Sequence, residues 1–218
     1  MTDNARHSSA SNEHYSPSEI VEAARTSLET IDLDPASCEA ANRTVRAARY
    51  YTKEQNGFLQ EWGGNVFLNS PGGWCDELGR QVIKKSKESG PCTETGDCGL
   101  PTPHEHFGTD SSQKRWWQEL VFKWAAGHVK SAVFVCFSIE LLQSTQVDQQ
   151  GPLPLEFPIC FPRKRVAYIK PDGTVGGSPP HASCIICVTK DLGTLYRFRR
   201  AFSIIGHVVI PYGFENRG

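Results

Sequence analysis

Apolar side chains recur every three or four residues in parts of the sequence, the spacing of a helix with one buried face. The clearest case begins at Ser16 and Pro17, a capping residue and a first-turn proline, which precede Ile20 and Ala24. This pattern predicts a helix over residues 16–29. Further helices are predicted over residues 37–48 with Ser37 as the cap, 78–86, 112–126 and 192–202.

Short apolar runs alternate with these helices and predict strands. They cover residues 31–33, 65–69, 132–137, 184–188 and 204–210. The run over 132–137 is continuously apolar, which is typical of a strand in the middle of a sheet that helices cover on both faces. The alternation predicts an α/β fold with a mostly parallel sheet and helices on both faces.

Composition along the chain predicts one domain with two polar segments. Residues 1–14 are rich in Ser, Asn and charged side chains, and we expect them to form a disordered leader. Residues 15–218 are long enough for a single domain. Within it, residues 88–113 are rich in Gly and Pro and have few apolar residues, which predicts a surface insertion.

The charges are distributed unevenly. Residues 160–200 carry eight Lys and Arg against two Asp, a net charge of +6 in a chain whose total is −1. This excess favours a polyanion docking on the last third of the chain, and a merely solvated charged face is the alternative. The sequence contains no apolar run long enough to cross a membrane and no signal-peptide pattern, so we expect a cytoplasmic protein without a membrane partner.

Polar motifs follow two of the predicted strands, where ligands bind in open α/β sheets. Asp34-Pro35-Ala36-Ser37 follows the first, Asn69-Ser70-Pro71-Gly72 follows the second, and Tyr15-Ser16-Pro17 precedes the first helix. In this order the three motifs resemble those of the phage-type N6-adenine DNA methyltransferases. The resemblance is close over residues 15–73 and looser beyond. It implies a Rossmann-like methyltransferase fold in a bacterium or a phage-infected cell.

The resemblance assigns the chemistry to Asn69, Ser70 and Pro71. The N6 amine of adenine is a poor nucleophile because its lone pair is delocalised into the ring. The Asn69 carboxamide and the Ser70 carbonyl, held by the rigid Pro71 turn, would accept the two amine hydrogens and favour the geometry that attacks a methyl group. No covalent intermediate with the protein is needed, and we find no persuasive nucleophile motif.

The resemblance also implies a cofactor, S-adenosylmethionine. Its predicted contacts lie in the first two motifs: Tyr15, Ser16, Pro17, Asp32, Asp34, Pro35 and Ala36. An Asp after the first strand can bind the ammonium of the methionine moiety. The glycine-rich turn that many methyltransferases have at this point is absent here.

The sequence departs from the family pattern at two positions of the third motif. Ser70 stands where the family usually has proline, and Gly72 stands where it has an aromatic ring that stacks on the substrate base. Trp74 is a candidate to supply that ring, with a role as a lid over the core as the alternative. The departures leave open a catalytically silent nucleic-acid-binding protein and methylation of a non-DNA amine.

Two other groups of residues bear on partners. Arg163, Lys164 and Arg165 are predicted to contact DNA phosphates. Cys92 and Cys98, with the His104-Glu105-His106 triplet nearby, have the wrong spacing for a common zinc motif, so we expect no metal site. The leading hypothesis is therefore an S-adenosylmethionine-dependent enzyme that methylates the N6 of adenine in DNA.

Overall fold

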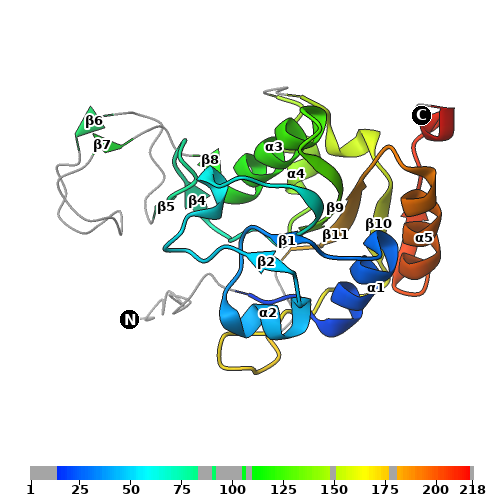
Figure 1. Cartoon of the computed structure of the whole chain (residues 1–218), viewed down its shortest axis with the longest axis horizontal. Helices are drawn as coiled ribbons and strands as arrows, with labels where there is room; N and C mark the ends of the chain where they lie inside the picture. Colours follow the sequence, from blue (N-terminus) through cyan, green and yellow to red (C-terminus); the bar gives the residue numbers. More distant parts are fainter. Residues whose placement is uncertain are drawn as a thin grey trace, which may run out of the picture.

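The computed structural model describes residues 14–82, 110–147, 151–176 and 181–216, together with the main chain of residues 90–91 and 105–106. At its centre is a seven-stranded sheet in the order β12-β10-β11-β9-β3-β1-β2 (Figure 1). The strands are β1 (Leu33–Asp34), β2 (Arg49–Tyr50), β3 (Gly64–Leu68), β9 (Val129–Cys136), β10 (Ile159–Pro162), β11 (Cys184–Val188) and β12 (Gly206–Val209).

The sheet has a parallel half and an antiparallel half. β2, β1, β3 and β9 pair in parallel, whereas β11 is antiparallel to β9 and β10, and β12 is antiparallel to β10. Five strands (β2, β1, β3, β9 and β10) thus share one direction, so the sheet is mostly parallel, and β9 lies in its middle as predicted. The direction of β10 brings its carboxyl end to the same edge as those of β1, β3 and β9.

Helices cover both faces of the sheet, as predicted (Figure 1). One face packs against α1 (Ser18–Leu28), α2 (Glu39–Val45) and α5 (Leu192–Phe202), and the other against α3 (Ser112–Ala125) and α4 (Glu140–Ser144). Each face of the sheet has its own hydrophobic core, and alternate residues of a strand pack into opposite ones. Phe67 and Val133 pack against α1, α2 and α5, and Val66 and Phe134 pack on the side of α3 and α4. Cys184 and Cys187 likewise lie on opposite faces and are both buried in the core.

Short elements complete the described chain. β4 (Trp74–Cys75), β5 (Gln81–Val82) and β8 (Asp110–Ser111) form a small sheet, and β6 (Gly90–Pro91) pairs with β7 (Glu105–His106). The 3-10 helices are η1 (Gly57–Leu59), η2 (Pro154–Glu156) and η3 (Phe214–Asn216). None of the helices within the described ranges is long and apolar enough to span a membrane.

Three local predictions were wrong. The predicted helix over 78–86 is a turn followed by β5 in its described part, because Arg80 and the main chain of residues 78–80 are held by the Asp76 carboxylate. Cys38 caps α2 in place of Ser37, and Ser16 makes no capping bond to α1. The predicted leader overlaps His14, which is described, whereas residues 1–13 lie outside the described part, as do Cys92, Cys98 and His104.

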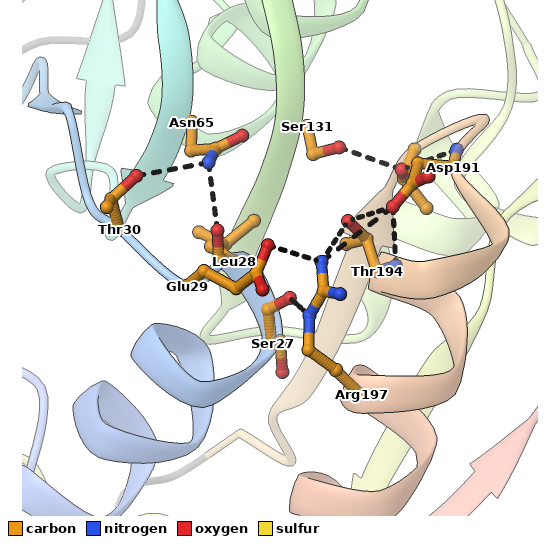
Figure 2. A network of polar contacts seen from close by, with 10 residues as sticks. Ser27, Leu28, Glu29, Thr30, Asn65, Ser131, Asp191, Thr194 and Arg197 are labelled. Carbon is orange, nitrogen blue, oxygen red and sulfur yellow. Dashed lines mark hydrogen bonds and ion pairs between the residues drawn. The ribbon is translucent and has the colours of Figure 1, made fainter.

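A polar network ties α1 to α5 at the amino-terminal edge of the sheet (Figure 2). The Arg197 guanidinium donates from Nε to the Ser27 carbonyl at 3.0 Å and pairs with Glu29 at 3.2 Å. Asp191 caps α5 by accepting from the Thr194 N–H at 2.6 Å. These contacts fix the two helices at the edge that faces away from the candidate site.

Candidate functional site

A cavity of about 510 Å³ lies at the carboxyl ends of β1 and β3. Its walls are formed by residues 14–16, by residues 34–38 after β1, by residues 69–71 after β3, and by residues 79–81 of the β4–β5 hairpin. Parallel neighbouring strands with turns at one edge form such a hollow because their loops diverge. Residues from all three sequence motifs, which are distant along the chain, therefore line one cavity.

Asn69 is oriented by a contact from the segment before α1. Its Nδ2 donates to the His14 carbonyl oxygen at 2.8 Å. Because a carbonyl only accepts, this bond fixes which side of the amide is nitrogen and leaves Oδ1 on the other side. Neither Asn69 Oδ1 nor the Ser70 carbonyl oxygen accepts a hydrogen bond from the described part of the chain. Both acceptors are thus available to a ligand.

Asp34 is a buried acid on the wall after β1. It is 3% exposed, and its Oδ1 accepts from the Ala36 N–H at 3.2 Å. Burial raises the pKa of this carboxyl to about 7, although the hydrogen bond from the Ala36 N–H opposes the shift. A cationic ligand group beside Asp34 would be stabilised by the ionised form.

Tyr15 and Ser16 are held at the cavity by main-chain pairing. Tyr15 and Ile169 exchange two main-chain hydrogen bonds at 2.7 and 2.9 Å, so the segment that follows β10 meets the site. Cys38 donates to the Tyr15 hydroxyl at 3.3 Å. The hydroxyl oxygens of Ser16 and Ser70 are buried and have no partner among the described residues. Buried hydroxyls without partners are uncommon and point to contacts made with a ligand or water.

Gly57 closes the cavity beneath Pro35. A Cβ on Gly57 would come within 1.8 Å of the Pro35 carbonyl oxygen, so only glycine fits there. The Trp62 indole donates to the Gly57 carbonyl at 2.7 Å and fixes this approach. Pro35 therefore lies in the cavity wall on a rigid support.

Besides the basic segment of Arg163, Lys164 and Arg165, four predicted site residues do not line the cavity: Pro17, Asp32, Gly72 and Trp74. Asp32 instead accepts from the Asn65 N–H at 2.8 Å and connects β1 to β3. The Gly72 carbonyl accepts from Gln81 Nε2 at 3.0 Å, and Trp74 lies in β4. The Trp74 ring is thus not part of the cavity wall, and the aromatic side chains that do line it are His14, Tyr15, Phe67 and Trp116.

The predicted basic segment follows β10 and lies outside the cavity wall. Arg163 donates to the carbonyl oxygens of Ile204 and Ser203, at 2.7 and 3.0 Å, and so caps the end of α5. Lys164 and Arg165 are exposed. The carboxyl end of β10 is at the same edge of the sheet as the cavity, so this segment lies on the side where a large substrate would approach.

The sequence prediction missed several residues that line the cavity: His14, Lys53, Glu54, Arg80, Gln81 and Trp116. Arg80 and Gln81 were assigned to a helix, and His14 to the leader. Trp116 lies in the predicted helix over 112–126 and is 4% exposed, and the sequence gave no reason to assign it to the site and not to the core. The sequence signal for the hairpin was Asp76, four residues before Arg80. An Asp side chain can accept hydrogen bonds from the main-chain N–H groups that follow it and so stabilise a turn.

The cavity has the size and composition of a small-molecule site. Its volume lies within the range of small-molecule sites. Phe67 and Ala36 give it apolar walls, Asp34 gives it a buried carboxyl, and Ser16 gives it a hydroxyl without a partner. Such a set can hold an ammonium, hydroxyl groups and an apolar ring. No group of three metal-ligating side chains occurs within the described ranges.

Comparisons with known proteins add no assignment. No family model matches the sequence, and searches of the curated proteins and of the solved structures returned no match. The functional argument therefore rests on the cavity and its residues.

Proposed function

We propose that the protein is an S-adenosylmethionine-dependent methyltransferase that acts on the N6 amine of adenine in DNA. The observation that carries the proposal is the orientation of Asn69, whose amide nitrogen is held by His14 while its oxygen and the neighbouring Ser70 carbonyl have no partner in the described chain. Two adjacent acceptors in a cavity suit an amine with two hydrogens to donate.

In this proposal the chain binds and orients both reactants. Asp34 and Ser16 hold the polar groups of the cofactor, which supplies an activated methyl group when bound. Asn69 Oδ1 and the Ser70 carbonyl accept the amine hydrogens and make the nitrogen lone pair available. Because these acceptors are already in position, little reorganisation is needed as charge develops on the amine.

The charge distribution supports DNA as the substrate. The segment after β10 passes from Lys164 and Arg165 to Ile169, which pairs with Tyr15 at the cavity. Cationic side chains therefore belong to a segment that reaches the cavity, where they can bind backbone phosphates. The target base must leave its stack to enter a cavity, which places phosphate contacts at the rim.

Two measurements on the purified full chain test the proposal. Calorimetry with S-adenosylmethionine should show one-to-one binding, and no binding would indicate a silent nucleic-acid-binding protein. Transfer of a radiolabelled methyl group to DNA should then follow. Binding of the cofactor without transfer to any DNA would favour a non-DNA amine, and such a protein should lack salt-sensitive DNA affinity.

A further inference from the structure

The hairpin that joins β4 to β5 is folded around a buried carboxylate. Asp76 is 2% exposed, and its Oδ1 accepts from the N–H groups of Leu78 and Arg80 at 3.0 and 2.9 Å. Its Oδ2 accepts from Arg80 Nε at 2.7 Å. One carboxylate thus fixes both the main chain and the side chain of Arg80.

Contacts from neighbouring elements hold this turn in place. Asn56 Nδ2 donates to the Leu78 carbonyl at 3.0 Å, and Arg115 donates to the Glu77 carbonyl at 3.1 Å. Gly79, at φ +72°, packs so closely on Phe58 that a Cβ would lie 2.4 Å from the ring. The position of Arg80 is therefore set by the core and not by a flexible loop.

Arg80 belongs to the part of the cavity wall that the hairpin forms. It lines the cavity, its side chain is 33% exposed, and the adjacent Gln81 donates to the Gly72 carbonyl. That bond attaches the hairpin to the turn that carries Asn69. Because the hairpin is bonded to this turn, we assign Arg80 to the substrate side of the cavity.

We propose that Arg80 contacts the substrate base, with its planar guanidinium stacked on the heterocycle. This inference rests on the proposed function and names a further substrate-binding residue for it. Asp76 offsets the local charge of Arg80 and fixes the plane of its guanidinium, which weakens its attraction for a phosphate and favours stacking. A planar, uncharged heterocycle matches that arrangement better than a phosphate does.

The test is fluorescence anisotropy of labelled single-stranded dA12 and dC12 over a series of KCl concentrations. Single strands present bases that are already unpaired, so extrusion does not mask the contact. We expect Arg80→Ala to bind dA12 about tenfold more weakly than the unmodified protein with an unchanged salt dependence. Arg80→Lys keeps the positive charge but loses the planar guanidinium group, and it should not restore the affinity for dA12. Arg43→Ala removes an exposed arginine outside the cavity and should bind normally.

Three results would overturn the inference. A salt slope reduced by about one in Arg80→Ala, restored by Arg80→Lys, would make Arg80 a phosphate contact. Unchanged affinity in a variant that unfolds at the normal temperature would leave Arg80 with no part in binding. Normal binding of dA12 by Arg80→Lys, at an unchanged salt dependence, would exclude a contact through the guanidinium plane. Because none of these measurements requires methyl transfer, they stand apart from a failure of the proposed activity.

Discussion

The side-chain amide of Asn69 donates to the main-chain carbonyl of His14 at 2.8 Å and joins the end of β3 to the segment before α1. The contact links the motif after β3 to the residue that precedes the motif Tyr15-Ser16-Pro17. It also sets the direction of the Asn69 carboxamide, so the predicted amine acceptor is oriented by the fold before any ligand binds.

Asn69→Ala should abolish methyl transfer while cofactor binding survives. The variant loses one hydrogen bond to His14, about 1 kcal/mol, and one preorganised acceptor, which we expect to lower the rate at least a hundredfold. Asn65→Ala is the matched control, because Asn65 also bonds a main-chain carbonyl, that of Leu28, but lies outside the cavity. Single-turnover rates and thermal unfolding of both variants separate the roles. Equal transfer rates in the two variants would remove Asn69 from the chemistry.

The raised pKa of Asp34 predicts that a rise in pH lowers the stability of the empty protein but strengthens the binding of a cationic ligand. Because the buried carboxyl has a pKa of about 7 in the folded chain and an ordinary value when unfolded, it destabilises the empty protein increasingly from about pH 4 to pH 7. Asp34→Asn should therefore raise the melting temperature at pH 8 by ~4–8 °C, about 2 kcal/mol, and by much less at pH 4.

A cationic ligand at Asp34 should bind more tightly at high pH than at low pH. The ionised carboxylate is the form that attracts an ammonium, so affinity for S-adenosylmethionine should fall as the pH drops below about 7. Calorimetry between pH 6 and 8 measures this, with Asp34→Asn as the control that should bind weakly at every pH. A pH-independent affinity in the unmodified protein would show that Asp34 does not contact the cation.

The basic segment after β10 should divide into a structural and a binding part. Arg163→Ala removes the cap of α5 and should lower the stability by about 1–2 kcal/mol with little effect on DNA affinity. Lys164→Ala with Arg165→Ala should instead weaken DNA binding and flatten its salt dependence at normal stability. Anisotropy with duplex DNA at several salt concentrations, combined with thermal unfolding, distinguishes them. A salt dependence unchanged in the double variant would assign these residues to a solvated face.

Arg197→Ala should destabilise the chain without altering the site. The substitution breaks the contacts that join α1 to α5, including the bond to the Ser27 carbonyl (Figure 2). We expect a loss of about 1–2 kcal/mol, since the guanidinium is partly exposed and its ion pairs are screened by solvent. Urea unfolding measures this loss. If cofactor affinity falls together with stability, the network at the amino-terminal edge of the sheet also affects the cavity at the opposite edge, which would contradict this prediction.

The α/β fold followed from the sequence where periodicity was strong. The buried run of β9 and the apolar stripes of α1, α3 and α5 depend on residues within one element, and these elements formed as predicted. β2 (Arg49–Tyr50) is short and carries no apolar pattern, and β10 (Ile159–Pro162) is partly exposed, so neither gave a signal. Their places depend on pairing with distant strands, which a local pattern does not contain.

The site was predictable where it lies at strand ends and not where a turn supplies it. Asp34 and Asn69 follow apolar runs, so the rule for ligand sites in α/β sheets brought them together. Arg80 enters the cavity because Asp76 folds the hairpin, and Trp74 is directed away from the cavity by pairing in β4. The position of Arg80 depends on a side-chain contact and that of Trp74 on strand pairing, and spacing alone determines neither.

The most direct test of the central claim is mass spectrometry of nucleosides after the protein has acted on DNA. The purified chain is incubated with S-adenosylmethionine carrying a deuterated methyl group and with unmethylated DNA of diverse sequence, and the DNA is then digested to nucleosides. We predict labelled N6-methyldeoxyadenosine with the unmodified protein and with Asn65→Ala, and none with Asn69→Ala. No labelled N6-methyldeoxyadenosine from a folded protein that binds both the cofactor and DNA would contradict the account.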